Sequence, residues 1–293
     1  MLKGAAGLNF GNGGPGGVIN IVTKRPTERL SMEAKLTVGE RNTKILAGDL
    51  SVPLGSGFAV RVTGEVERSD SFIQFSEIER DNVGAVLTFD SGPFRATGRY
   101  ERHVVRDDRA MTRIGLPVIG TILPGPVAID RSLYLGEPSF DFTRSFGNQA
   151  SLFLAYDITP QLTVEAAGRR ATVNFEQGDI RTLSQLNPAT LRVTRTRGRL
   201  LDLTNARGLA KLRIPGGSGD HEIAVGYEFF RQDLNIVNRN LSNAVIPTIS
   251  VVAPTYLIGG LQAALPASVP TPHQRADSNE VFAQGVARFG GAT

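Results

Sequence analysis

The sequence predicts an all-β fold, a partial antiparallel transmembrane β-barrel of roughly ten strands. Three observations lead to this prediction. From residue 32 onward, apolar residues recur at every second position. The extended segments are joined alternately by short turns and by long connections, and no window approaches the 18 consecutive apolar residues of a membrane-spanning helix. Strands with one apolar and one polar face fit a barrel wall between lipid and water.

The clearest alternation occupies residues 58–67. Its two faces are Phe58, Val60, Val62, Gly64 and Val66 on the apolar side, and Ala59, Arg61, Thr63, Glu65 and Glu67 on the polar side. The segments 82–90 and 94–101 repeat the pattern. Alternation by itself also fits a soluble antiparallel sheet with one wet face, so both structures stay open on this observation.

The elements follow one another in a regular order. Strands are expected near 32–38, 43–52, 58–68, 80–90, 94–104, 145–157, 161–174, 199–214, 220–233 and 279–289. Short turns are expected at 53–57, 90–93, 157–161 and 215–220, and long connections near 69–79, 105–144, 175–198 and 234–278. Tight turns on one rim and long loops on the other are typical of outer-membrane barrels. Compact soluble domains rarely carry several long structureless connections, so the alternation favours the membrane barrel.

A glycine-rich stretch precedes the first of these strands. Residues 11–17 hold five glycines and Pro15, which predicts a tight irregular turn, and Pro26 ends the short strand expected over 18–23. The spacing Gly11-x-Gly13-x-x-Gly16 also occurs in dinucleotide-binding turns, but those need a preceding strand and a following helix. Here a strand follows, which leaves an ordinary glycine-rich turn as the other physical interpretation.

Residues 2–26 closely resemble the end of the plug domain of TonB-dependent outer-membrane receptors, siderophore receptors in particular. The residues of this plug-end motif are Gly11, Gly13, Pro15, Gly16, Gly17, Asn20, Lys24, Arg25 and Pro26. Further segments resemble barrel strands and a loop of the same receptors: 49–54, 59–64, 69–72, 115–117, 131–138 and 279–284. The resemblance implies that residues 1–28 are the C-terminal end of a plug domain and residues 29–293 the N-terminal part of an incomplete barrel.

The resemblance implies a fragment of a receptor for active uptake of ferric siderophores across the cell outer membrane, not an enzyme. Its implied partners are a ferric siderophore, the TonB energising complex (whose contact segment is not in this chain), and outer-membrane lipid and lipopolysaccharide. Neither nucleic acid nor a cofactor is expected, and iron enters only as the bound ferric siderophore. Barrels that hold a plug have about 22 strands, so we expect no transport by this chain alone. The alternative is a passive porin-like or structural β-protein.

Composition limits the chemistry. The 293 residues include no Cys and three widely spaced His, which excludes disulfides and thiolate sites and makes a built metal centre unexpected. The net charge is +4, and the N-terminus lacks the apolar run of a signal peptide. A basic run climbs from the strand 94–104 into the following loop and supplies the predicted ligand-binding residues, Arg95, Arg99, Arg106, Arg109 and Arg113.

Arg95 and Arg99 share the polar face, so they are expected to line the lumen. A positive mouth would attract anionic iron chelates through long-range fields and guanidinium hydrogen bonds. The alternative is that these arginines offset nearby acids or contact lipopolysaccharide at the rim. Ferrichrome-type receptors bring aromatic residues to the ligand where this chain has residues 112–115, Thr-Arg-Ile-Gly, which argues against a hydroxamate-specific site.

Overall fold

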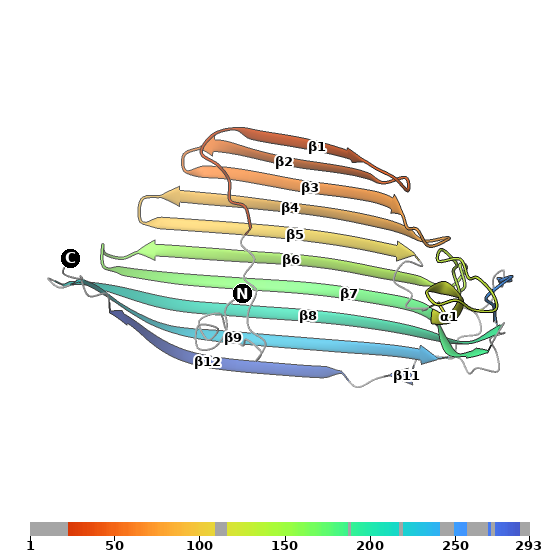
Figure 1. Ribbon diagram of the computed structural model, residues 1–293. Coiled ribbons are helices and arrows are strands. Elements are labelled where there is room, and N and C mark those ends of the chain that lie inside the picture. The colour runs from red at the N-terminus through yellow and green to blue at the C-terminus, as the bar shows by residue number, and fades with distance from the viewer. Residues whose placement is uncertain are drawn as a thin grey trace, which may run out of the picture.

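A single antiparallel sheet makes up most of the chain (Figure 1). The computed structural model describes residues 23–108, 116–186, 189–216, 219–240, 249–256, 269–270 and 273–287. The strands run in chain order from β1 to β9, and β12 pairs with the outer side of β9. The elements are β1 (Ser31–Val38), β2 (Lys44–Gly55), β3 (Phe58–Asp70), β4 (Glu77–Ser91), β5 (Phe94–Asp108), α1 (Val118–Thr121), β6 (Phe142–Asp157), β7 (Leu162–Leu186), β8 (Ala189–Gly216), β9 (Gly219–Asn240), β10 (Ile249–Ser250), β11 (Val269–Pro270) and β12 (Gln274–Ala287).

All ten predicted strands are confirmed. The long connection predicted over 175–198 is wrong, because β7 continues to Leu186 and β8 begins at Ala189. Backbone pairing extends there beyond the alternating segments, and a hairpin outside the lipid needs no apolar face. The connection predicted over 234–278 is shorter for the same reason, since β9 reaches Asn240 and β12 begins at Gln274. The division into 1–28 and 29–293 stays a prediction, because most of the first part lies outside the described residues.

The two ends of the strands differ as predicted. The connections after β2, β4, β6 and β8 lie together at one end, and the longer ones lie at the other (Figure 1). Two short connections also lie at the long-connection end: residues 39–43 between β1 and β2, and the connection from Leu186 of β7 to Ala189 of β8. Gly57 shows why glycine is needed at the tight end: its φ is +84°, and a Cβ there would lie 2.0 Å from the carbonyl oxygen of Asp90.

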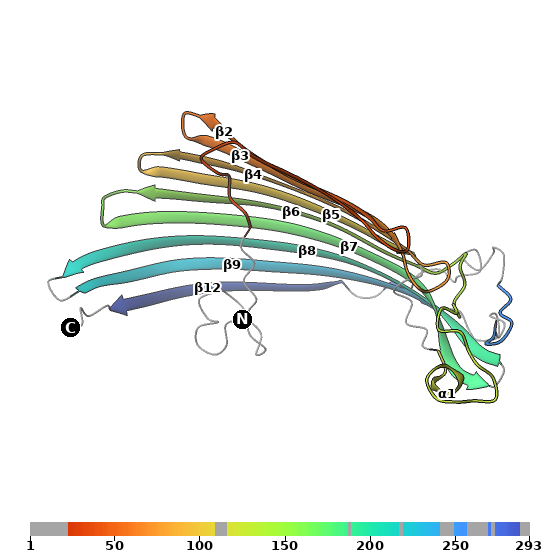
Figure 2. The ribbon, with the colours of Figure 1, turned by 45° about the horizontal axis from the view of Figure 1, so that its top comes forward.

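The sheet has an apolar face and a polar face, because directly opposed residues of neighbouring strands point the same way. The apolar face carries, among others, Leu36, Leu46, Val62, Leu87, Leu152, Val225 and Val281, all of which are exposed. About half of the surface of Leu152 and of Val225 is exposed. No element of the described chain covers this face (Figure 2). The soluble sheet with a sealed core, the second structure that alternation allowed, therefore does not match the observed packing.

The apolar face forms a band of membrane dimensions. On β3 it runs over the nine residues from Phe58 to Val66. A transmembrane strand, which lies tilted in the bilayer, needs about 9–11 residues. The boundary toward the long loops runs diagonally. Val66 is the boundary residue on β3, and Val281 is the boundary residue on β12. From Val281, the directly opposed residues on successive strands are Tyr227, Gly208, Ala166, Leu154, Ala96, Phe89 and, on β3, Phe58. Because Phe58 and not Val66 is level with Val281, the two boundary residues are eight residues apart in register.

A tyrosine that is hydrogen-bonded to an asparagine on the neighbouring strand occurs at two places along this boundary. The hydroxyl of Tyr100 on β5 donates to Asn148 Oδ1 on β6 (3.1 Å), and the hydroxyl of Tyr227 on β9 donates to Asn279 Oδ1 on β12 (2.6 Å). Tyrosines with a wet hydroxyl and a buried ring are typical of membrane interfaces. Among the described helices, which comprise only the distorted turn α1, none is long and apolar enough to cross a membrane.

Candidate functional site

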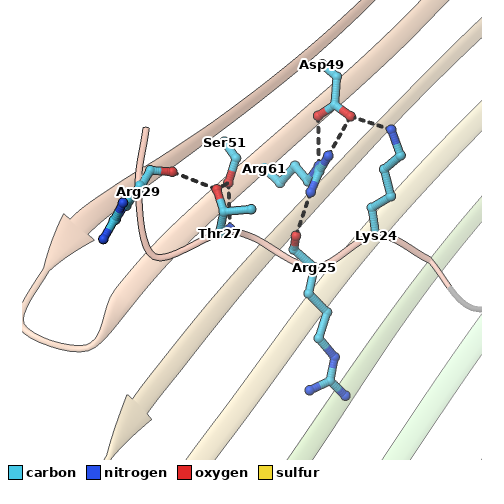
Figure 3. A network of polar contacts seen from close by, with 7 residues as sticks. All are labelled: Lys24, Arg25, Thr27, Arg29, Asp49, Ser51 and Arg61. Carbon is cyan, nitrogen blue, oxygen red and sulfur yellow. Dashed lines mark hydrogen bonds and ion pairs between the residues drawn. The ribbon is translucent and has the colours of Figure 1, made fainter. Parts of the chain in front are cut away.

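The segment before β1 lies across the polar face and is fixed there by an ion pair (Figure 3). Asp49 on β2 accepts from Arg61 Nε at 2.7 Å and from Arg61 Nη2 at 2.6 Å. The side chains of Asp49 and Arg61 are 12% and 14% exposed. Two contacts then reach the segment: Lys24 Nζ lies 2.7 Å from Asp49 Oδ2, and Arg61 Nη1 donates to the carbonyl oxygen of Arg25 at 2.8 Å. One bidentate pair thus holds both a side chain and the backbone of the entering segment.

A second attachment of this segment to the sheet joins Thr27 to Ser51. The Thr27 amide donates to Ser51 Oγ at 2.8 Å, and the hydroxyls of these two residues are 2.9 Å apart. Ser51 on β2 is fully buried, and the Thr27 hydroxyl donates to the carbonyl oxygen of Arg29 at 2.7 Å (Figure 3). Pro26, which lacks an amide donor, stands between the two anchored residues. The residues that end the predicted plug motif are therefore those that attach to the wall.

Two cavities open on the polar face beside this segment. The larger, about 540 Å³, has a mixed-charge lining that includes Lys24, Lys35, Asp49, Glu65 and Glu101. Acidic and basic groups alternate there, which gives the cavity no strong preference for one sign of charge.

The second cavity, about 300 Å³, is positive. Among the residues that the structure describes, its lining includes Arg25, Arg99, Arg169, Thr97 and Ser151 and no acidic residue. Arg169 Nη2 donates to Gln149 Oε1 at 2.6 Å. Arg99 Nε is buried and has no hydrogen-bond partner within the part of the chain that the structure describes. Three guanidinium groups beside two hydroxyls, without a carboxylate, form a site suited to an anion. We call these residues the arginine cavity.

The predicted ligand-binding arginines do not come together. Arg99 lies in the arginine cavity, whereas Arg95 lies at the tight-turn end of β5 and pairs with Asp157 at 2.6 and 2.9 Å. Arg106 lies near the other end of the strand on the opposite face, with Glu79 Oε2 at 3.3 Å. Arg109 and Arg113 lie outside the described residues, as do the motif residues Gly11, Gly13, Pro15, Gly16, Gly17 and Asn20.

Sequence reasoning missed Arg61, Asp49 and Arg169 as site residues. A signal was available, because the alternation already assigned Arg61 to the polar face and Asp49 belongs to a segment with receptor resemblance. What the alternation lacked was the register, which brings Arg99 and Arg169 to the two sides of Ser151, and the path of the segment before β1, which places Arg25 beside them.

A buried polar cluster organises the loop before β6. Asp141 accepts from the Tyr134 hydroxyl and, at 2.8 Å each, from the amides of Glu137 and Ile180. Burial raises the pKa of Asp141 to about 7, although these donors favour the charged form. Gly136 is required here, since a Cβ would lie 1.9 Å from Asp141 Oδ2. The cluster joins this loop to the distal end of β7.

An apolar cluster and a cavity complete the loop assembly. Ile129, Leu135, Ile249 and Val251 are buried together, and the Tyr256 hydroxyl donates to the carbonyl oxygen of Tyr134 at 2.8 Å. A cavity of about 280 Å³ lies beside them and is lined by Phe72, Ile73, Leu116, Pro117, Thr121, Ile122, Arg131, Leu133, Tyr134 and Leu135. The described residues include no group of three or more His, Asp or Glu placed to hold a metal ion.

Comparison with known proteins relates the chain to siderophore receptors. No family model matches it. It is 23% identical over 284 residues to the catecholate siderophore receptor Fiu of Escherichia coli, covering 89% of the chain and 37% of Fiu. It is 26% identical over 148 residues to the ferrioxamine B receptor of Salmonella typhimurium, covering 48% of the chain and 20% of that receptor. It is 25% identical over 171 residues to the probable TonB-dependent siderophore receptor PiuA of Acinetobacter baumannii, covering 56% and 23%.

The fold agrees with these relationships. The closed-form crystal structure of Fiu superimposes with a TM-score of 0.81 at 19% identity, over 97% of this chain and 42% of Fiu. The chain therefore spans well under half the length of the receptors that it matches. These relatives are receptors rather than enzymes, and they do not favour a passive porin-like or structural protein. In sequence the chain is similar to part of several siderophore receptors, and in fold it is similar to part of Fiu.

Proposed function

We propose that the chain forms part of an outer-membrane receptor that takes up an anionic ferric siderophore, with the sheet as barrel wall and the segment 23–27 as the attachment of the plug. The observation that carries this proposal is the arginine cavity. It lies on the polar face between the wall and the entering segment, and Arg99 Nε is buried there without a hydrogen-bond partner among the described residues.

The chemistry of the cavity favours a chelate with net negative charge. Three doubly deprotonated catechol groups outweigh the charge of one ferric ion, whereas three singly deprotonated hydroxamates only balance it. Guanidinium groups form short bidentate hydrogen bonds with anionic oxygens. A relative that aligns with most of the chain is named for catecholate siderophores, which agrees with this preference. No covalent step is needed for such binding, so the receptor requires neither a catalytic residue nor a cofactor.

Release of the bound chelate requires movement of the plug, and we assign the energy for it to the TonB complex. The segment 23–27 is attached to the wall by Asp49, Ser51 and Arg61. These contacts are hydrogen bonds and ion pairs on a polar face, which can break without exposing apolar surface to water. The segment 23–27 can therefore detach from the wall when the rest of the plug moves.

Binding of radioactive iron chelates to the full chain, folded in neutral detergent, tests the proposal. We expect a ferric tris-catecholate to bind more tightly than a neutral ferric tris-hydroxamate, and we expect Arg99→Gln combined with Arg169→Gln to remove that difference. Arg169→Gln alone is compared with Arg170→Gln, which removes the same single charge from the neighbouring residue on the apolar face, where Arg170 lies 4.0 Å from Asp202. Equal binding of both chelates, or an equal loss with Arg170→Gln, would contradict the proposal.

A further inference from the structure

The sheet has two borders that no strand of the described chain covers. Among the described residues, β1 pairs only with β2 at one border, and β12 pairs only with β9 at the other. Apolar side chains at these borders are more exposed than those within the sheet: Leu36, Val38 and Val281 are 69%, 70% and 81% exposed, against 51% for Leu152. Each border therefore presents apolar side chains and a row of backbone groups to a further strand.

The sequences of both border strands permit such pairing. Neither β1 nor β12 contains a proline, so every residue of the two strands has a backbone amide that can donate. In the hydrocarbon core of a membrane, unpaired backbone groups are costly, and strands are stable there only in a closed sheet. The proposed function places the apolar face in a membrane, where both borders require a partner strand.

The directions of the border strands fit a second copy of the same chain. The ten strands β1 to β9 and β12 follow one another antiparallel, so β1 and β12 run in opposite directions (Figure 1). A half-turn about the axis of a barrel places β12 of a second copy beside β1 of the first and antiparallel to it. The same rotation brings the other two borders together, so one contact is used twice and the assembly closes.

The faces of the border strands also agree. The even-numbered residues of β1 and the odd-numbered residues of β12 lie on the apolar face. Val38 and Val281 end the apolar rows toward the long loops, so alignment of the band opposes Val38 to Val281. A stagger of two residues, the next that alternation permits, opposes Val38 to Ala283. In neither register do two charged residues of the described β1 and β12 stand opposite each other.

The slope and curvature of the sheet fit two copies. The band boundary shifts by eight residues over the seven steps from β3 to β12, and a stagger of zero or two residues at each contact continues this slope. Because the chain superimposes on Fiu, its sheet curves as the wall of that receptor does. Barrels that hold a plug have about 22 strands. Two copies of ten strands supply nearly that number, whereas a third copy would require a much wider barrel.

We propose that two copies of the 293-residue chain pair through β1 and β12 and close one barrel in the membrane. The closed barrel rests on the proposed function, since that function places the apolar band in lipid. Each copy keeps its own arginine cavity, because Arg25, Arg99 and Arg169 belong to one chain. The two segments 23–27 then lie in one lumen, each attached to its own wall.

Cysteine cross-linking of the full chain, folded in neutral detergent, tests this contact. The sequence contains no cysteine, so introduced thiols are the only ones present. Residues 38 and 281 lie at opposite borders of one copy, and a disulfide between them therefore joins two copies. Directly opposed residues of antiparallel strands are within reach of a disulfide. We expect Val38→Cys with Val281→Cys, or Val38→Cys with Ala283→Cys, to form on oxidation a covalent dimer of twice the 31.4 kDa chain mass.

Thr37→Cys with Ala283→Cys is the matched control, because its thiols lie at the same borders but on opposite faces, and it should remain uncross-linked. Val38→Cys and Val281→Cys should not cross-link when each is folded alone, since like borders do not meet in the closed barrel.

Native mass spectrometry of the unchanged chain provides a readout that needs no substitution, and a dimer is expected. A monomeric mass for the unchanged chain, equal cross-linking in the control, or a covalent dimer of either single variant would overturn the contact. Chelate binding is measured separately. Because each arginine cavity lies within one copy, a monomeric chain that binds chelate leaves the proposed function intact, and a dimer that binds none leaves the contact intact.

Discussion

Replacing Asp49 by Asn should release the segment 23–27 from the sheet. Asp49 is the shared acceptor of Arg61 and Lys24, and Arg61 in turn holds the carbonyl oxygen of Arg25. An asparagine keeps the shape but removes the charge, and its amide can accept through only one atom. Arg61, which is largely buried, would then lose the group that orients it.

The magnitude follows from the contacts. Hydrogen bonds to charged groups stabilise by about 1.5–3 kcal/mol. The contribution of Lys24 is small by comparison, since its side chain is 63% exposed and solvent screens the pair. We expect the attachment of residues 23–27 to weaken by about 1.5–3 kcal/mol, which is about a ten- to hundredfold increase in the population of the detached segment. The strands themselves should keep their stability.

Hydrogen exchange of the Thr27 amide measures this population, because that amide donates to Ser51 only while the segment is attached. The full chain is folded in neutral detergent, and exchange in Asp49→Asn is compared with the unchanged chain. Asp157→Asn is the matched control: it removes a bidentate partner of Arg95 on the same face but far from the segment. Unchanged exchange in Asp49→Asn, or equal acceleration in both variants, would refute the reasoning.

Three further outcomes are expected. Because the pKa of Asp141 is raised from 3.8 to about 7, loop stability should be greatest below pH about 4, fall as pH rises to about 7 and then stay level; exchange of the Ile180 amide measures it, and Asp141→Ala should abolish the dependence. Leu87→Arg should destabilise the chain in lipid by about 2–4 kcal/mol in denaturant titrations, and Thr88→Arg on the polar face by much less. Gly57→Ala should cost about 1–3 kcal/mol, more than Gly55→Ala, where a Cβ meets nothing within 4 Å.

The strands were predictable because each carries its own signal. The alternation over residues 58–67 gives the period, the faces and the membrane dimension without reference to any other part of the chain. The hairpin of β7 and β8 was missed where it leaves the band, because strand residues beyond the lipid need not alternate. Apolar and polar residues alternate where one face of a strand meets lipid and the other meets water, and the alternation ends where both faces meet water.

The sites were less predictable, because they depend on register. Arg99 could be assigned to the polar face from spacing alone, but its neighbour Arg169 follows from strand pairing and its neighbour Arg25 from the path of the segment before β1. The cluster around Asp141 was not predicted, since it joins a loop to β7 through backbone amides that carry no sequence signal. Gly136 belongs to the segment 131–138, which was noted only for its resemblance to a receptor loop. The structure explains this glycine, because a Cβ there would collide with Asp141.

The oblique edge of the apolar band fixes the inclination of the strands. Eight residues of displacement, about 26 Å, accumulate over the seven neighbouring strands that lead from β3 to β12, about 34 Å. The strands must therefore lean about 38° from the membrane normal, within the 35–45° of closed outer-membrane barrels. β1 and β12 are not paired with each other, but the stagger between neighbouring strands already equals that of a closed barrel. Any strands that complete it must match this slope at both borders.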